Sequence, residues 1–362
     1  MMSQELDEKI EADDDGDEVV PKVSFEVTSF GSDPEVELLV KRLNRRDIII
    51  PTFQRDYVWR QPEASKFIES LLLGLPVPGL FFATDANTNK QLVIDGQQRL
   101  RTLQFFYNGF FNPRIGDTTQ RTFALTKVQE PFEGLTYATL PEHDRIRLDT
   151  SIIHATTIKQ TKPAGDDTSL YHIFERLNSG GRRLTDQEMR LAIYHGPLID
   201  LIKELNDYAP WRKIFGKPHT RLKDQELILR FFAIFHRLNE YQRPLSEFLN
   251  KYAGRNRNLS STTAANMGKL FRNTVDTFSS SLSGRPFRLT TSLNVAVYDS
   301  CMVGLAKRIE ASKKLPEPKA VLSAYTKLLQ DTSYLEAASR STADQLFVKR
   351  RVERAIQAFS KC

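Results

Sequence analysis

The feature that most constrains the fold is a change of pattern at Gly196. From there onward, apolar residues recur every three or four positions in one segment after another, which is the spacing of amphipathic helices. Such segments cover residues 198–205, 222–238, 245–252, 264–278, 295–309, 320–329 and 343–359. We therefore expect an all-helical domain over residues 196–362.

The preceding part of the chain mixes two periodicities. Helical spacing over residues 33–46 and 62–75 is followed by two strand-like runs, residues 80–84 and 91–94, which a turn-forming segment joins. This mixture predicts a β-hairpin inside an α/β domain over residues 21–195. The whole chain is therefore expected to be α+β, with an α/β N-terminal core and a helical C-terminal domain.

A helix-capping pattern lies near the end of the predicted α/β domain. Residues 151–158 are strand-like and residues 170–177 have helical spacing. Thr185 is followed three positions later by Glu188, the capping-box arrangement in which each side chain bonds the backbone of the other residue. A helix is therefore predicted to begin near Asp186.

The first 20 residues form an acidic tail that masks a basic protein. A strongly acidic segment with few apolar residues predicts disorder, and it is the reverse of a secretory or transit peptide. Without the nine acids and one lysine of residues 1–18, the 51 basic and 45 acidic residues of the chain become 50 and 36, a net charge of +14. Such a charge attracts nucleotides and nucleic acids, although it serves general solubility equally well.

Several classes of protein are disfavoured by the sequence. Cys301 and Cys362 are the only cysteines, the six histidines lack zinc-site spacing, and no serine-nucleophile, P-loop or Rossmann glycine motif occurs. The longest apolar stretch, residues 71–83, is interrupted by glycines and prolines and is too short for a membrane helix. We expect a cytoplasmic protein without membrane contact.

The strongest candidate for chemistry is the motif at residues 95–99, where the second strand of the hairpin passes into a helix over residues 97–108. Glycine before a helix lets a ligand approach the backbone, and the unpaired amides of the first turn favour a phosphate. Arg99 would bind the same anion, Asp95 would hold a metal ion or polarise water, and glutamines would orient that water or read a base edge. These candidate residues are Asp95, Gly96, Gln97, Gln98 and Arg99. A purely structural role explains the same residues equally well. In that interpretation Asp95 caps the helix, Gly96 forms the turn and Arg99 is a surface charge.

Two further segments, residues 53–59 and 174–181, indicate a function only in combination with this motif. Residues 53–59 concentrate aromatic side chains around Gln54 and Arg55, which suits base stacking and phosphate binding, although a core role is favoured for Trp59. Residues 174–181 end in a Gly-Gly loop in which Asn178 could contact an anion. A simple helix stop accounts for that loop as well.

In this order, the three elements resemble the GmrSD-type restriction endonuclease N-terminal domain family. The resemblance covers about residues 35–200. It lies in the runs IPTFQR at residues 50–55, LPVP at 75–78, VIDGQQRL at 93–100 and FERLNSGG at 174–181. The family reads Thr where this chain has Arg101, which is expected either to add a phosphate contact or to point away.

The resemblance implies a ParB/sulfiredoxin-like core that binds and hydrolyses a nucleoside triphosphate with Mg²⁺, in systems that restrict phage DNA carrying modifications. Carried over to this chain, it assigns catalysis to Asp95, Gln97, Gln98 and Arg99, with Asp95 as metal ligand. The implied nucleotide-binding residues are Gln54, Arg55, Gly96, Arg99 and Asn178.

One departure concerns DNA cleavage. Family members that cut DNA carry an HNH nuclease domain, and no His-rich metal-binding pattern follows residue 200. We therefore expect a DNA-sensing NTPase that works with a separate nuclease subunit. A nucleotide-switched DNA-binding module without turnover and a weak DNA-nicking enzyme are the alternatives. Apolar helical faces in the C-terminal half are compatible with an oligomer or with a larger core.

Overall fold

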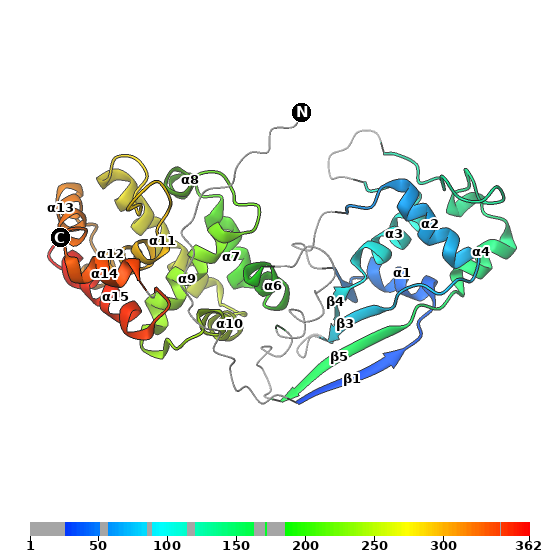
Figure 1. Cartoon of the computed structure of the whole chain (residues 1–362), viewed down its shortest axis with the longest axis horizontal. Coiled ribbons are helices and arrows are strands. Elements are labelled where there is room, and N and C mark those ends of the chain that lie inside the picture. Colours follow the sequence, from blue (N-terminus) through cyan, green and yellow to red (C-terminus); the bar gives the residue numbers. More distant parts are fainter. Residues whose placement is uncertain are drawn as a thin grey trace. The chain divides into compact units, whose positions relative to one another are not determined.

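A computed structural model describes residues 26–50, 57–84, 89–113, 120–162, 171, 185–340 and 342–362. The chain divides into two compact units, one over Ser24–Leu184 and one that begins at Thr185 (Figure 1). Each unit has its own core, so the two are described separately. None of the described helices combines the length and the apolarity needed to cross a membrane.

The N-terminal unit is built on a five-stranded mixed sheet with the strand order β1-β5-β3-β4-β2. Strands β3 and β4 form the predicted antiparallel hairpin, while β5 pairs parallel to β3, β2 pairs parallel to β4, and β1 pairs antiparallel to β5. The strands are β1 (Glu26–Ser32), β2 (Ile48–Ile49), β3 (Leu80–Thr84), β4 (Gln91–Asp95) and β5 (Ala155–Lys162). In this order β4, which leads to the candidate motif, lies between β3 and β2.

Strand β1 was not predicted from the sequence. Its residues read EVTSFGS, and Thr28 to Ser32 are exposed, so the strand lacks the alternation of apolar and polar residues that marks a half-buried strand. It forms because its backbone pairs along its whole length with β5.

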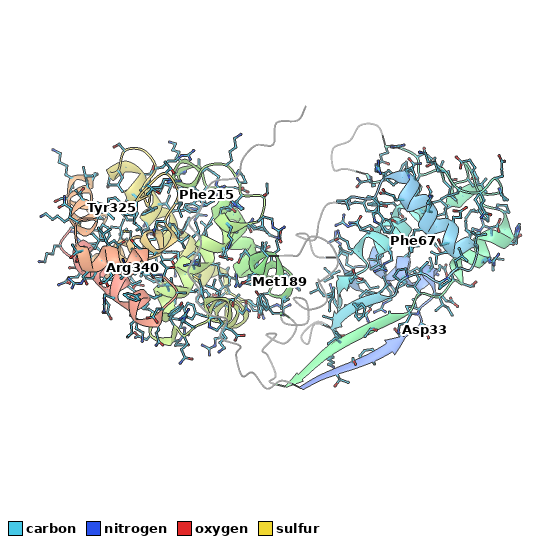
Figure 2. The ribbon with its side chains drawn as sticks, in the orientation of Figure 1. Asp33, Phe67, Met189, Phe215, Tyr325 and Arg340 are labelled. Carbon is cyan, nitrogen blue, oxygen red and sulfur yellow. The ribbon has the colours of Figure 1, made fainter. Side chains whose placement is uncertain are left out.

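Helices pack on one side of this sheet (Figure 1). Their apolar faces meet the sheet in a common core, as the helical spacing predicted, and Phe67 of α2 is labelled among these side chains in Figure 2. The helices are α1 (Val36–Asn44), α2 (Gln61–Leu72), α3 (Gln97–Asn108), the 3₁₀ turn η1 (Tyr137–Thr139) and α4 (Glu142–Asp149). Helix α4 was missed because only Asp144 and Leu148 of its eight residues are buried, which leaves almost no apolar period.

The second unit is entirely helical over its described residues, which confirms the predicted α+β class for the chain. All seven predicted helices are present, and α12 at their centre buries residues on every side. The helices are α6 (Asp186–Ile193), α7 (Pro197–Asn206), α8 (Ala209–Phe215), α9 (Lys223–Arg237), η2 (Leu238–Glu240), α10 (Leu245–Arg255), α11 (Ser261–Ser281), α12 (Val295–Ser312), α13 (Pro318–Leu328), α14 (Thr332–Ser339) and α15 (Gln345–Phe359). The short helices α8 and α14 were not predicted.

Helix α6 begins with the predicted capping box and packs within the helical unit. The predicted capping box is present, because Thr185 accepts from the Glu188 backbone and Glu188 accepts from the Thr185 backbone. The buried Arg190 guanidinium bonds Asn250 at 2.8 Å and Glu226 at 3.2 Å. By its contacts α6 therefore belongs to the helical unit, whereas the sequence pattern placed the boundary at Gly196.

Candidate functional site

The site is centred on the junction between β4 and α3, where the motif was expected. Asp95 is the last residue of β4, and α3 begins at Gln97 after Gly96. The backbone of Gly96 is left-handed, with φ 98°, and a Cβ atom there would lie 2.3 Å from Cδ2 of Leu80. A side chain is disfavoured at this position, because the left-handed backbone strains it and Leu80 would have to move to make room.

The first turn of α3 lacks a side-chain cap. The N-cap residue is Gly96, which has no side chain that could accept a hydrogen bond from the amides that follow. Asp95 is therefore not the helix cap that the structural interpretation of the motif required. An uncapped helix start favours an anion, because its amides carry partial positive charge.

Asp95 and Arg99 form an ion pair one helical turn apart. Nη2 of Arg99 lies 2.9 Å from Oδ2 of Asp95, and the two side chains are 11% and 60% exposed. The surface-charge interpretation does not describe Arg99, since its side chain is largely covered. The pair holds a guanidinium beside the start of α3, where the sequence analysis predicted phosphate binding.

The two glutamines of the motif lie in different surroundings. Gln97 is buried, while the amide oxygen of Gln98 accepts hydrogen bonds from the backbone N–H of Val58 at 3.0 Å and of Trp59 at 3.4 Å. Gln98 thus ties the end of the predicted aromatic loop to α3. The structure brings the first and second sequence elements together through this side chain.

A second connection between these elements involves Tyr57 and Thr102, which the sequence analysis did not select. The Tyr57 hydroxyl lies 2.6 Å from Oγ1 of Thr102, and that oxygen also donates to the carbonyl of Gln98 at 2.8 Å. Burial raises the pKa of Tyr57 to about 12. The sequence offered one signal for Thr102: it lies four residues after Gln98, and therefore on the same face of the helix as a residue of the motif.

The two described aromatic residues of the loop, Tyr57 and Trp59, pack in the core. Tyr57 is buried and packs edge-on against Phe105, with ring centroids 4.9 Å apart. Trp59 is half-buried and packs against Phe67 with centroids 5.8 Å apart, in agreement with the core role favoured for it. Stacking of a base on Tyr57 is incompatible with this packing.

Three predicted site residues lie outside the described residues. Gln54 and Arg55 belong to residues 51–56, and Asn178 belongs to residues 172–184. Arg101 is half-buried on α3. The described part of the site is therefore the motif itself with the loop end at residues 57–59.

A metal ion would find few protein ligands here. Among the described residues, no group of three His, Cys, Asp or Glu side chains could hold a metal. Asp95 is the acid of the motif, and one of its oxygens bonds Arg99. Its carboxylate fits Mg²⁺ only in the manner of nucleotide sites, where phosphate oxygens and water supply most of the ligands.

A match to a known protein family covers most of the N-terminal unit. Residues 36–195 match the family model described as GmrSD restriction endonuclease, N-terminal domain. No curated protein matches the chain. The match covers the β3–β4 hairpin, the motif on α3 and the capping box of α6. The resemblance predicted for about residues 35–200 is therefore confirmed: residues 36–195 form a domain similar to the N-terminal domain of the GmrSD restriction endonuclease.

Proposed function

We propose that this protein binds and hydrolyses a nucleoside triphosphate at residues 95–99 and senses DNA, including modified phage DNA, in a restriction system. The match of residues 36–195 to the GmrSD N-terminal domain supports the role in restriction. In this role the protein would signal to a separate nuclease subunit.

The observation that carries the proposal is the covered guanidinium of Arg99 at an uncapped helix start. An arginine that is 11% exposed and fixed by Asp95 is oriented before a ligand arrives. Its planar fork suits two phosphate oxygens, and the amides at the start of α3 favour the same charge. Gly96 keeps this approach free of a side chain.

The reaction would be an attack of water on the γ-phosphorus. The new bond joins the water oxygen to phosphorus, the bond to the β–γ bridging oxygen breaks, and the products are a nucleoside diphosphate, inorganic phosphate and one proton released to solvent. Arg99 would stabilise the charge on the phosphate oxygens. Gln97 and the amide nitrogen of Gln98 are proposed to orient the water, because the amide oxygen of Gln98 is held by the loop. When Mg²⁺ is bound through Asp95, it supplies further neutralisation of the phosphates.

A nucleotide-switched DNA-binding module is the second candidate. The observation that favours it is the engagement of Asp95 with Arg99, which leaves the described part of the motif without an unpaired carboxylate to act as general base. In that case the nucleotide would bind tightly and remain intact.

The test is phosphate release from each of the four ribonucleoside triphosphates with Mg²⁺, with and without phage DNA. Turnover that DNA stimulates and that Asp95→Ala removes supports the NTPase. Tight nucleotide binding with no phosphate release selects the switched module. Nicking of supercoiled plasmid with Mg²⁺ and without nucleotide would select the nicking enzyme instead.

Nucleotide binding by Arg99→Ala provides the residue-level test. We expect this variant to lose binding, and Arg99→Lys to recover only part of it, because lysine lacks the planar fork. The matched control is Arg45→Ala, which removes an exposed arginine paired with Asp47 at 3.3 Å in the same unit. Unchanged binding by Arg99→Ala would remove the site assignment.

A further inference from the structure

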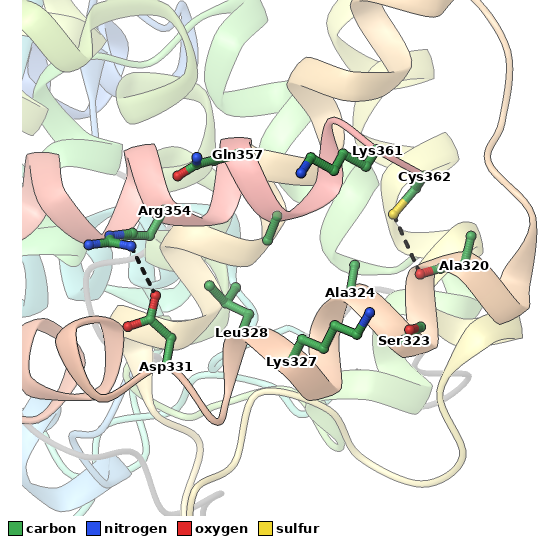
Figure 3. Close-up of a pocket in the computed structure, with 11 residues that line it drawn as sticks. Ala320, Ser323, Ala324, Lys327, Leu328, Asp331, Arg354, Gln357, Lys361 and Cys362 are labelled. Carbon is green, nitrogen blue, oxygen red and sulfur yellow. Dashed lines mark hydrogen bonds and ion pairs between the residues drawn. The ribbon is translucent and has the colours of Figure 1, made fainter.

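A groove of about 520 Å³ lies between α13 and α15 in the helical unit (Figure 3). Small side chains form much of its lining, including Ala320 and Ala324 on α13 and Ala358 on α15. They recur on facing helix surfaces, so the two helices leave an open channel between them. The other lining residues are Ser323, Lys327, Leu328, Asp331, Arg354, Gln357, Lys361 and Cys362.

Positive charge faces this groove from both walls. Lys327 of α13 and Lys361, which follows α15, are exposed and lie on opposite walls in Figure 3. Neither lysine forms an ion pair with another residue in the described part of the chain. Their ammonium groups are therefore available to an anionic ligand.

The acid that lines the groove, Asp331, is already engaged. Its Oδ1 accepts hydrogen bonds from the backbone of Ser333 and Tyr334 and so caps α14. Its Oδ2 lies 3.3 Å from the guanidinium of Arg354. Asp331 therefore does not cancel the charge of the two lysines.

The groove lies in a basic part of the helical unit. Residues 301–362 hold 12 Lys and Arg against 6 Asp and Glu, a net charge of +6. On α15, Arg350 and Arg354 are each paired with an acid, Glu336 at 3.9 Å and Asp331 at 3.3 Å, so the uncompensated charge at the groove comes from the two lysines on its opposite walls. An extended polyanion matches this distribution better than a single small anion does.

The lining residues also indicate how the polyanion is contacted. No aromatic side chain belongs to the described residues that line the groove. Proteins that hold single strands stack bases on aromatic rings, whereas lysines and small polar groups contact phosphates of a duplex without reading sequence. We propose that the α13–α15 groove binds the phosphate backbone of double-stranded DNA, an inference that rests on the proposed function for the identity of the polyanion.

The test is fluorescence anisotropy of the full chain with a labelled duplex of about 30 base pairs, at salt concentrations from about 50 to 200 mM. Lys327→Gln/Lys361→Gln is expected to weaken binding more than about tenfold and to lower the slope of log affinity against log salt by about 2. Lys327→Arg/Lys361→Arg should retain the affinity, because it keeps both charges.

The matched control is Lys251→Gln/Lys269→Gln. These exposed lysines lie on α10 and α11 of the same unit, so the control makes the same change in net charge outside the groove. Equal effects of the two double variants would overturn the proposal, as would wild-type protein that does not bind duplex DNA or that binds an acidic protein instead. Phosphate release without DNA is measured in parallel. If it is normal while the groove variants bind DNA like the control, the DNA-binding proposal fails and the proposed hydrolysis does not.

Discussion

The amide oxygen of Gln98 accepts hydrogen bonds from the backbone of Val58 and Trp59, 40 and 39 residues earlier in the chain. This contact joins the aromatic loop to the helix that carries the candidate site. Residues 51–56, which contain Gln54 and Arg55, directly precede Tyr57 in the sequence.

Replacing Gln98 with Ala is expected to weaken nucleotide binding by about tenfold, or about 1.4 kcal/mol, because the loop end is no longer tied to α3. Its effect on the free energy of unfolding should be only about 1 kcal/mol, since the bonds lie near the surface. Isothermal titration with nucleotide and urea unfolding measure the two quantities. Gln104→Ala is the control, because Gln104 on the same helix bonds Asn44 instead. A similar loss of nucleotide affinity in both variants would contradict the role of the loop contact.

Gly96→Ala is expected to destabilise the N-terminal unit by at least about 2 kcal/mol. The added Cβ would clash with Leu80 in a left-handed backbone. The comparison is Gly109→Ala at the other end of α3, where φ is 80° but no atom lies within 4 Å of the added Cβ. That variant should cost about 1 kcal/mol. Urea midpoints of the two proteins test the difference, and equal midpoints would show that Leu80 moves aside.

Asp299→Ala should strongly destabilise the helical unit. Asp299 is fully buried and lies 2.6 Å from Arg230, which is 2% exposed. Removing the carboxylate leaves a buried guanidinium without its counter-charge, at a cost of about 3 to 5 kcal/mol. Thermal unfolding measures the loss. In Glu240→Ala, which breaks exposed pairs with Arg237 and Arg255, the midpoint should barely change, since water and salt screen those charges.

The raised pKa of Tyr57 predicts that the folded protein loses stability at alkaline pH. This pKa is raised from 10 to about 12, first because burial disfavours the phenolate. Above pH 10 the unfolded chain releases this proton while the folded protein retains it, so the contribution of Tyr57 to stability is complete below pH 10. That contribution is lost as the pH rises to about 12, and the loss is about 2 kcal/mol.

The comparison for this prediction is Tyr57→Phe. The variant lacks the hydroxyl and its bond to Thr102, so it should be less stable than wild type at pH 8. Urea unfolding at increasing pH should show the two free energies converging above pH 10. A constant difference between the proteins would mean that Tyr57 titrates equally in the folded and unfolded chains.

The sequence alone determined the elements that depend on neighbouring residues. The hairpin of β3 and β4, the start of α3 after Gly96, the capping box at Thr185 and the seven long helices were all predictable. Periodicity, turn residues and caps act over a few positions, so they can be read from the chain. The family resemblance followed from the same local runs.

The tertiary structure decided how distant residues meet. Packing covers Arg99, places Gln98 against Val58, buries Tyr57 and assigns α6 to the helical unit. The same holds for β1, which needs β5 to form, and for the groove between α13 and α15. These features were not predictable because burial and long-range hydrogen bonds depend on the packing of whole elements, and no local pattern in the sequence specifies that packing.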